Sequence, residues 1–427
     1  MLLILSGGRT AHSRFHIPLH PTDESFCTIS PSSKLGELIR KEKLLIWDEA
    51  PMVNKMCVEA LDRSMYDICR PSNPDSMDTL FGGKTDVFGG DFRQILLVIP
   101  KGKREDIVDA SLNSSYLWDY VTVLKLTVNM RLCGIETDAH TRSFAQWILN
   151  IGNSDVGESE DGIFDIEIPQ DLLITDLDDP IGSIISTIYP DYLLNLGNPE
   201  YYQQRAILTP THEVVNIIND RMMMSLEGEE RSYLSSDSIC ASQRDADFNN
   251  ELYTTDFLNS IEVGGLPKHN LRLKIGVRVM LHRNIDQAGG LCNGTRLQIV
   301  QLRDKIIKAK NLTGSNVGKI TALSRMLIIP TDKRIPFRFQ RRQYPLSVCF
   351  AMTINKSQGE SLSRVGLFLP KTIFSHGQLY VALSRVTNRQ AIKILILDKD
   401  NKLSNTIKKC GIQRSLATLI DLIEEMF

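Results

Sequence analysis

Residues 44–51 read LLIWDEAP, and this stretch decides the fold of the chain. Its four leading apolar residues are too few for a helix, and such a short unbroken run is typical of a strand buried in a sheet. Two acids follow the strand directly, at the end where ligands bind in open α/β sheets. The pattern predicts that Asp48 holds Mg²⁺, directly or through water, and that Glu49 orients and deprotonates an attacking water. The alternative is an ordinary strand end with two solvated acids.

The segments around this strand predict a parallel sheet with helices on its faces. Residues 34–42 and 54–69 have the apolar spacing of helices, whereas 85–88 and 121–126 have the pattern of strands. Strand, helix and strand in that order are typical of an α/β fold. A chain of 427 residues is too long for one ordinary core, so we expect two domains and an insertion.

Residues 81–94 read FGGKTDVFGGDFRQ and contain GGKT, the last letters of a nucleotide phosphate loop. Such a loop has the spacing G-x-x-x-x-G-K-[ST], follows a strand and precedes a helix. Here Asp78 stands where the first glycine belongs and a strand follows Thr85, so Lys84 is predicted to enter a strand and not to bind phosphate. No other stretch of the sequence fits the loop. The second half of the segment has the chemistry, because the uncharged amide of Gln94 near a strand end can sense a terminal phosphate.

Composition and spacing exclude several kinds of protein. No run approaches the roughly 18 apolar residues of a membrane helix, and the first residues lack the features of a signal peptide, so we expect an intracellular protein without membrane contact. Eight cysteines with no C-x-x-C pair argue against a zinc ribbon and a disulfide framework. His12, His16 and His20 have the spacing of a metal face on a helix. Pro18 and Pro21 break any helix there, so we expect no metal at these histidines.

Charge is distributed unevenly along the chain. Residues 268–342 hold 17 Lys or Arg, three Asp and no Glu, a local charge of +14 in a chain of net charge −2. Their β-rich segments, separated by Gly and Asn turns, predict a small basic β-barrel inserted into a second α/β pattern at 204–224 and 345–359. The barrel favours a polyanion partner, and a solvated basic surface is the alternative. By contrast, 154–180 hold ten acidic residues and no basic one, which predicts a linker or a solvated excursion and not a core.

Two motifs near the end of the sequence add polar groups. TINKSQGESL places Lys356, Ser357 and Gln358 on a turn that ends in glycine. SHGQLYVALSRV, residues 375–386, predicts a helix with Arg385 on its last turn. An arginine that reaches a γ-phosphate across a domain cleft can stabilise the charge of the transition state. The alternative is a surface arginine that balances the helix dipole.

Eight ordered motifs give the chain a close resemblance to one family, between about residues 7 and 397. They are GGRTAHSRFHIPL, LLIWDEAP, FGGKTDVFGGDFRQ, LTVNMRL, RAILTPTHEVVNIIN, LKIGVRVMLHRNIDQAGGLCNGTRL, AMTINKSQGESL and FSHGQLYVALSRV. Together they resemble the Pif-one family of superfamily 1B DNA helicases, in the form found in plant and helitron-derived genes. The resemblance implies an α/β chain of two RecA-like parallel-sheet domains of the P-loop NTPase fold, the first one incomplete, with a small β-barrel inserted in the second.

The resemblance also implies domain boundaries. Residues 1–135 would form the partial first RecA-like domain and 136–200 an acidic helical linker region. Residues 201–235 and 343–427 would form the second RecA-like domain, and 265–342 the inserted basic barrel.

The resemblance assigns roles to residues at matching positions. Glu49 matches the catalytic base, Gln94 the γ-phosphate sensor, and Arg131 and Arg385 the arginines that contact the triphosphate from either side. Asp48 matches the Mg²⁺ ligand. The full set that the resemblance places on the nucleotide is Asp48, Gln94, Arg131, Gly359, Glu360 and Arg385. The set that it places on DNA is Thr10, His12 and Ser13 from the first domain and Thr353, Lys356, Ser357 and Gln358 from the second.

The function that the resemblance implies is an ATP-dependent DNA helicase that uses ATP and Mg²⁺ and moves 5′ to 3′ on single-stranded and forked DNA. Repair, recombination and telomere maintenance are its implied processes, in the nucleus or alternatively the mitochondrion. Family members carry a glycine-rich phosphate loop upstream of the segment that matches GGRTAHS, where this sequence begins. We therefore expect a chain truncated before that loop, with weak or absent ATP hydrolysis on its own. The alternative is a catalytically dead DNA-binding remnant.

Overall fold

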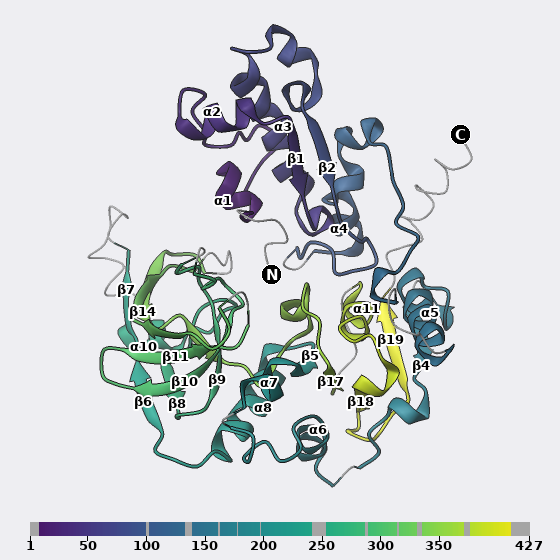
Figure 1. The fold of residues 1–427 in the computed structure, drawn as a ribbon, viewed down its shortest axis with the longest axis vertical. Helices are drawn as coiled ribbons and strands as arrows, with labels where there is room; N and C mark the ends of the chain where they lie inside the picture. Colours follow the sequence, from purple (N-terminus) through teal and green to yellow (C-terminus); the bar gives the residue numbers. More distant parts are fainter. Residues whose placement is uncertain are drawn as a thin grey trace. The chain divides into compact units, whose positions relative to one another are not determined.

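The structure, a computed structural model, divides into two compact units (Figure 1). The described residues are 8–99, 102–132, 139–160, 163–176, 178–196, 198–240, 253–286, 289–313, 316–330, 335–370 and 376–410. Among them, the N-terminal unit takes 8–168, 376–384 and 406–410, and the C-terminal unit takes 169–370 and 385–405. No helix in these ranges is both long enough and apolar enough to cross a membrane.

The sheet of the N-terminal unit is built on the strand predicted from LLIWDEAP. Strand β1 (Leu44–Trp47) pairs in parallel with β2 (Thr85–Phe88). Helix α3 (Lys55–Cys69) lies between them in sequence and begins at Asn54, whose side chain accepts a hydrogen bond from the backbone N–H of Met56. The predicted order of strand, helix and parallel strand is therefore confirmed.

Only one face of this two-stranded sheet is covered by described residues. Trp47 is buried and packs with Phe88 in the cluster that contains the apolar side of α3. On the other face, Leu44, Ile46 and Val87 are 48%, 52% and 48% exposed. The prediction of a fully buried strand is thus wrong for half of the side chains of β1, because a parallel sheet buries both faces only where helices cover both.

Residues 121–126, which were predicted to form a strand, are irregular. They have no ladder partner among the described residues, and the side chains of Leu124 and Leu126 are 86% and 99% exposed. An apolar run becomes a strand only where a neighbouring strand accepts its backbone hydrogen bonds, and here none is described.

The predicted acidic linker contains packed structure instead. Strand β4 (Ile163–Glu167) pairs antiparallel with β3 (Glu158–Glu160) and with β19 (Thr406–Cys410). Phe164 and Ile166 are buried, whereas the acidic residues between and after them are exposed. The prediction is wrong because side chains alternate between the two faces of a strand: the acids of β4 point to solvent, and Phe164 and Ile166 point to the core.

The remaining elements of the N-terminal unit are short helices. The α-helices are α1 (Ala11–Phe15), α2 (Lys34–Lys41), α4 (Arg104–Asp109), α5 (Ala139–Asn153) and α11 (Gln378–Leu383). The 3₁₀ helices are η1 (Ala50–Met52), η2 (Pro74–Asp78), η3 (Leu80–Gly83), η4 (Leu112–Ser114), η5 (Tyr116–Tyr120) and η6 (Met130–Leu132). α11 comes from the far end of the chain and packs on α5.

The C-terminal unit contains the second parallel sheet, in the strand order β16-β5-β17-β18. Its strands are β5 (Arg205–Thr209), β16 (Ala351–Thr353), β17 (Arg364–Leu369) and β18 (Ile392–Ile396), and every pair is parallel. Helix α8 (His212–Met224) follows β5, as predicted from residues 204–224. The other helices around this sheet are α6 (Pro180–Ile188), α7 (Pro199–Gln203), η7 (Gln170–Leu172), η8 (Ile354–Ser357) and η9 (Arg389–Ala391).

Between β5 and β16 the chain forms antiparallel sheets. Their strands are β6 (Arg231–Leu234), β7 (Ser236–Ile239), β8 (Asn270–Leu273), β9 (Arg278–Leu281), β10 (Arg296–Leu302), β11 (Ile307–Asn311), β12 (Ile320–Leu323), β13 (Met326–Ile328), β14 (Phe339–Gln343) and β15 (Leu346–Val348), with helix α10 (Thr255–Ser260) among them. The described ladders form three sheets, β12-β11-β10-β9-β15, β13-β14-β7 and β6-β8. The β region therefore extends beyond the predicted range of 265–342 at both ends, and the ladders of its described residues do not close into one barrel.

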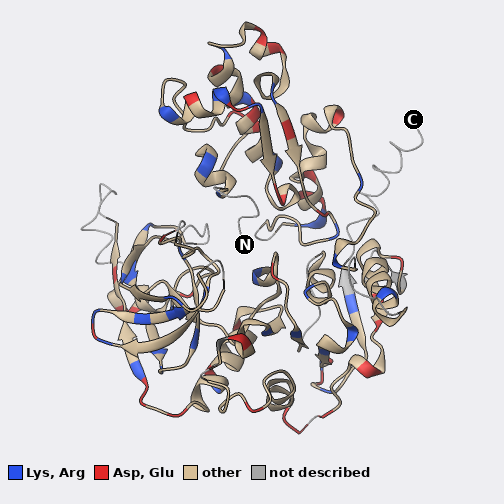
Figure 2. Cartoon of the chain, in the orientation of Figure 1, with Lys and Arg blue, Asp and Glu red and all other residues tan. Residues whose placement is uncertain are grey.

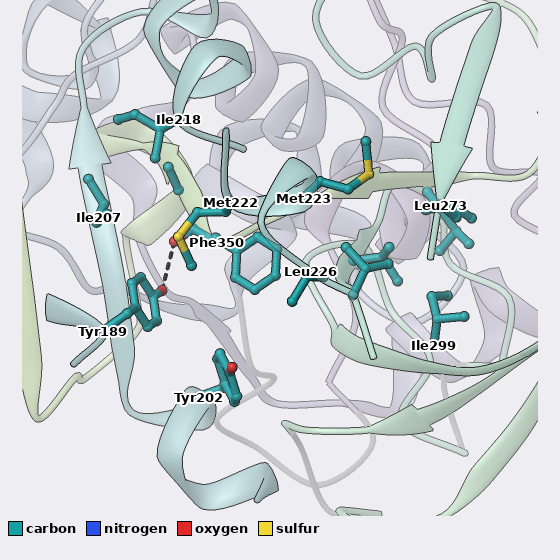
Figure 3. Packing of buried hydrophobic residues seen from close by; sticks show 14 of the residues in the cluster. Tyr189, Tyr202, Ile207, Ile218, Met222, Met223, Leu226, Leu273, Ile299 and Phe350 are labelled. Carbon is teal, nitrogen blue, oxygen red and sulfur yellow. Dashed lines mark hydrogen bonds between the residues drawn. The ribbon is translucent and has the colours of Figure 1, made fainter. Parts of the chain in front are cut away.

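One hydrophobic cluster joins the parallel sheet to the inserted strands (Figure 3). It runs from Ile207 of β5 through Met222 of α8 to Leu273 of β8 and Ile299 of β10. Within it, the hydroxyl of Tyr189 donates a hydrogen bond to the carbonyl of Phe350 over 2.8 Å. The main inserted sheet therefore shares its core with the domain that carries it.

Figure 2 shows Lys and Arg along the inserted strands, but some of the basic residues of 268–342 are buried. Arg278, Arg296 and Arg341 are 2%, 6% and 0% exposed. The exposed ones in the described residues are Arg303, Lys305, Lys308, Lys319, Arg338 and Arg342. The local charge of +14 thus overstates the charge that this region presents to a partner.

Candidate functional site

Backbone hydrogen bonds join the carboxyl ends of β1 and β2. The N–H of Gly89 donates to the carbonyl of Trp47 over 2.9 Å, and the N–H of Ala50 donates to the carbonyl of Gly89 over 2.9 Å. Asp48 and Glu49 lie between these two bonds. Glu49 has a φ of 58°, a conformation that costs energy in a residue with a side chain and that clusters at functional sites.

Asp48 has the properties of a Mg²⁺ ligand. Its side chain is exposed and its carboxylate has no hydrogen bond or ion pair with the described residues. A Cβ built on Gly89 would lie 3.3 Å from Oδ1 of Asp48, so the glycine leaves space beside that oxygen. No cluster of three metal-binding side chains occurs in the described part of the chain, and Mg²⁺ usually takes one or two carboxylates with phosphate and water ligands. Asp48 therefore suits a Mg²⁺ ion that a bound phosphate shares.

The loop GGDFRQ after β2 is held by α11. Oδ1 of Asp91 accepts a hydrogen bond from Nε of Arg93 over 2.7 Å, and Oδ2 accepts one from the hydroxyl of Tyr380 over 2.9 Å. Nε2 of His376 lies 2.9 Å from the carbonyl oxygen of Phe92. Two side chains from the α11 segment thus fix both the acidic and the backbone groups of this loop.

Gly377 brings α11 against Gln94. It is the N-cap of the helix with a φ of 77°, and a Cβ built on it would lie 2.3 Å from the carbonyl of Gln94. Only glycine allows that approach and tolerates that backbone angle. This contact was not predicted from the sequence, although the glycine before a helical stretch in SHGQLY was a signal that a tight approach was required.

Arg131 contacts the other end of α11. Its Nη1 donates a hydrogen bond to the carbonyl of Ser384 over 2.8 Å, at the C-cap of the helix, where the helix dipole favours a cation. α11 itself ends at Leu383, so Arg385 lies beyond the helix and not on its last turn as predicted. The N-terminal unit thus places the predicted residues Asp48 and Glu49 directly after strand β1, and Gln94 and Arg131 at the two ends of α11.

The predicted first-domain DNA residues lie on α1. Thr10 is its N-cap, and the side chains of Thr10 and Ser13 are exposed. Burial lowers the pKa of His12, whose Nε2 lies 3.8 Å from Sγ of Cys57. The helix ends before His16, so the prediction that the three histidines share no helix is confirmed.

Lys84 stabilises a helix end and not a phosphate. Its Nζ donates hydrogen bonds to the carbonyls of Arg40 over 3.1 Å and of Glu42 over 2.5 Å, at the carbonyl end of α2. Strand β2 begins at Thr85, immediately after it. The prediction that GGKT is a strand entry and not a phosphate loop is confirmed.

In the C-terminal unit, the turn after β16 holds Arg385. Arg385 is 4% exposed, and its Nη1 donates hydrogen bonds to the carbonyls of Ser357 over 3.2 Å and of Glu360 over 3.1 Å. Thr353, which ends β16, is buried. This unit therefore brings together the predicted residues that lie between these positions, namely Lys356, Ser357, Gln358, Gly359 and Glu360, with Arg385.

Two further basic residues act on this turn, one through its charge and one through an ion pair, and both were missed from the sequence. Desolvation and the positive charge of Arg283 lower the pKa of Lys356. Nη2 of Arg296 lies 3.2 Å from Oε2 of Glu360. Both arginines belong to the inserted strands and their connections, and no local pattern in the sequence indicated which of its many basic residues would reach the turn.

Comparisons with known proteins match three parts of the chain to family models. The model described as PIF1-like helicase matches residues 2–162, the 2B domain of DNA helicase Pif1 matches 256–302, and a model described as helicase matches 330–415. The ATP-dependent DNA helicase PIF1 of Homo sapiens is 30% identical over 187 residues, which are 43% of this chain and 26% of the relative. The Xenopus laevis protein of the same name is 28% identical over 190 residues, again 43% and 26%. The match thus spans about a quarter of the length of these relatives.

Solved structures match the fold of nearly the whole chain. Bacteroides Pif1 bound to single-stranded DNA superposes with a TM-score of 0.62 at 22% identity, over 93% of this chain and 81% of that one. Candida albicans Pif1 gives 0.57 at 21% identity, over 92% and 79%. These matches confirm the predicted fold class of RecA-like parallel-sheet domains.

Proposed function

The chain belongs to the PIF1-like helicase family, and from that premise we propose that it acts as an ATP-dependent DNA helicase. In this proposal it moves 5′ to 3′ on a single strand, unwinds forked DNA, and uses ATP with Mg²⁺. Its proposed processes are DNA repair, recombination and telomere maintenance.

The observation that carries the proposal is the joined carboxyl end of β1 and β2. Hydrogen bonds through Gly89 hold the ends of both strands together, with Asp48 and Glu49 directly after β1. α11 holds the neighbouring loop through Asp91 and Gln94. Carboxylates and an amide at adjacent strand ends are the groups that phosphoryl transfer requires for metal binding, water activation and phosphate sensing.

Each of these side chains has a chemical task in the proposal. Mg²⁺ held by Asp48 would supply charge neutralisation on the phosphates. The Glu49 carboxylate would accept a proton from the attacking water, and the Gln94 amide would donate a hydrogen bond to the terminal phosphate. Arg131 and Arg385 would balance the negative charge that develops on the triphosphate.

Similar structures support the DNA partner. Pif1 of Bacteroides was solved bound to single-stranded DNA, and another Pif1 structure addresses unwinding at forked double-stranded DNA. A third contains ADP-AlF3 together with single-stranded DNA. The exposed basic residues of the inserted strands would contribute phosphate contacts that do not depend on sequence.

Unwinding of labelled forks by the full chain tests the proposal. Strand separation by this chain alone should be weak, should depend on ATP and Mg²⁺, and should require a fork with a 5′ single-stranded tail, with none on a fork that has only a 3′ tail. Glu49→Gln should abolish unwinding and leave DNA affinity intact. Asp67→Asn, on the exposed side of α3, is the control and should behave as the wild type. Separation of 3′-tailed substrates alone would contradict the proposed direction.

DNA binding without hydrolysis is the second candidate. It is favoured by the sequence, in which no stretch fits the phosphate loop, and by the role of Lys84 at a helix end. A single-strand-stimulated ATPase rate for the wild type that equals that of Glu49→Gln, with DNA affinity retained, would select this second function.

We further propose that the protein works in the nucleus, with the mitochondrion as the alternative. A C-terminal fluorescent fusion expressed in cells and imaged with markers for both compartments distinguishes the two.

A further inference from the structure

A buried ion pair connects the inserted strands to the turn that holds Arg385. Arg296 is the first residue of β10, and its Nη2 lies 3.2 Å from Oε2 of Glu360. The two side chains are 7% and 16% exposed. The same Nη2 donates a hydrogen bond to the carbonyl of Gln203 over 2.8 Å. Arg296 thus touches the turn from a strand whose other contacts lie in the inserted sheet.

Glu360 is at the same time part of the support of Arg385. Its N–H donates to the carbonyl of Ser357 over 3.1 Å, and its own carbonyl accepts a hydrogen bond from Arg385 over 3.1 Å. The carbonyl of Arg385 accepts a hydrogen bond from the N–H of Leu362 over 2.9 Å. The side chain of Glu360 therefore faces the inserted sheet while its backbone holds the arginine.

The surroundings make this ion pair sensitive to the loss of either partner. Arg278, on the neighbouring strand β9, is 2% exposed, and its guanidinium carbon lies 3.5 Å from the centre of the Tyr202 ring. Its three nitrogens donate no hydrogen bond to the described residues. Its charge repels that of Arg296. Removing the carboxylate of Glu360 would leave Arg296 without its counter-ion while the charge of Arg278 still repels it, and removing Arg296 would leave a largely buried carboxylate.

We propose that Arg296 is a positioning residue that ties Arg385 to the inserted strands. Register pairs Arg296 with Met280 of β9, and the carbonyl of Arg296 accepts a hydrogen bond from the N–H of Leu312, so a shift of the inserted sheet moves Arg296 with it. The contacts described above are sufficient for a movement of the inserted sheet to reach the turn that holds Arg385. The consequence rests on the proposed function: DNA on the inserted strands would alter the turn, and with it the arginine assigned to the nucleotide.

Hydrogen exchange of the free full-length chain tests the positioning role. In Arg296→Met, the amides of Glu360 and Leu362 should exchange at least about tenfold faster than in the wild type. Glu360→Gln should do the same, and the double variant should add little to either single change, because all three break one interaction. Arg296→Lys, which keeps the charge, should give a smaller increase and covers the case in which the methionine variant does not fold.

Arg272→Met is the matched control, since it breaks the Arg272–Asp220 ion pair of the same unit away from the turn. It should leave both amides unchanged. If the amides of Glu360 and Leu362 exchange at the same rate in Arg296→Met as in the wild type, the positioning role is wrong. Where only Arg296→Lys folds, the same comparison is made with that variant.

A second arm adds an oligo-dT strand of about 20 nucleotides. The strand should change exchange at Glu360 and Leu362 by about twofold or more in the wild type and leave it unchanged in Arg296→Met at saturating strand. If the strand changes the exchange of these amides equally in both proteins, the effect of DNA on the turn does not pass through Arg296. If the wild type does not bind the strand, the proposed function is wrong, and so is the proposal that DNA binding alters the turn through Arg296. Hydrogen exchange of the free protein still decides the positioning role in that case.

Discussion

Tyr380 donates a hydrogen bond to Oδ2 of Asp91 over 2.9 Å, and this bond joins a helix near the end of the sequence to the loop that carries Gln94. Arg93 holds the other oxygen of the same carboxylate over 2.7 Å. The loop assigned to phosphate sensing therefore depends on a segment that follows the whole C-terminal parallel sheet except its last strand. The N-terminal unit is not the product of the N-terminal sequence alone.

Tyr380→Phe removes this bond and keeps the ring. We expect the free energy of unfolding of the N-terminal unit to fall by about 1.5 kcal/mol, because the acceptor is charged. Urea denaturation followed by tryptophan fluorescence measures it, since Trp47, Trp118 and Trp147 all lie in this unit. Tyr120→Phe, at a side chain that is 73% exposed, is the control. Equal stabilities of the two variants would show that the bond contributes nothing.

Gly377→Ala should destabilise more than backbone strain alone explains. Gly377 and Gly265 both have a φ of 77°, but a Cβ at Gly377 meets the carbonyl of Gln94 at 2.3 Å, whereas nothing lies within 4 Å at Gly265. Alanine at Gly265 therefore measures the cost of the backbone angle, about 1 kcal/mol. In scanning calorimetry, Gly377→Ala should lower Tm by several degrees more than Gly265→Ala. Equal decreases in Tm for the two variants would mean that the backbone at Gln94 moves away from the new methyl group at little cost.

Asp86 should make the N-terminal unit less stable as pH rises. One of its carboxylate oxygens is buried without a hydrogen-bond partner in the described residues, and burial, then the charge of Asp62, raise its pKa to about 7. The folded state thus holds a proton that the unfolded state releases near pH 4, so the stability from this group declines between about pH 4 and pH 7.

Asp86→Asn cannot titrate and should lack this decline. Its Tm, measured by tryptophan fluorescence, should gain on that of the wild type as pH increases through the window. Other groups titrate equally in both proteins, so only the difference between the two curves is informative. Curves that stay parallel from pH 4.5 to 7.5 would rule out a protonated Asp86.

Lys84→Met tests the role of the lysine in GGKT. The loss of two hydrogen bonds from a charged donor to the carbonyls of Arg40 and Glu42 should cost about 1.5 kcal/mol of unfolding free energy. DNA affinity should not change. Lys43→Met, at an exposed position next to α2, provides the baseline. A variant as stable as Lys43→Met, with altered nucleotide binding, would restore the reading of GGKT as a phosphate site.

DNA affinity should fall steeply with salt and depend little on base sequence. Alanine at three exposed lysines of the inserted strands should lower the slope of log Kd against log salt by about 2, since each phosphate contact on a single strand contributes about 0.7. These lysines are Lys305, Lys308 and Lys319. The control changes Lys34, Lys41 and Lys43, which are exposed on the N-terminal unit. If the two triple variants have the same slope, the inserted strands are not part of the surface that binds DNA.

Local patterns in the sequence were sufficient for the strand ends. The run before Asp48 and Glu49 predicted β1, and the failed spacing at Asp78 predicted that Lys84 enters a strand. In both places the signal lies within a few residues of the feature. The fold class followed from the order of such elements, because strand, helix and strand in sequence leave few arrangements open.

Features that depend on distant partners could not be predicted. Leu124 belongs to an apolar run that pairs with no strand among the described residues. Ile166 belongs to an acidic run that pairs with β19, near the far end of the chain. Arg341 counted toward a basic surface, yet it is fully buried in a salt bridge with Asp237, with Nη2 and Oδ2 2.6 Å apart. Its partner precedes it by the length of most of the insertion, and no local spacing marks the pair.

The shared core of the C-terminal unit has a consequence for synthesis in the cell. Strand β5 is buried at four of its five positions, but its ladder partner Ala351 lies beyond the whole insertion. The ribosome releases β5 first, and this apolar strand must wait many seconds for its neighbour at ordinary rates of translation. During that interval the apolar side chains of β5 lack the later strand that pairs with them in the folded protein, which favours aggregation over folding.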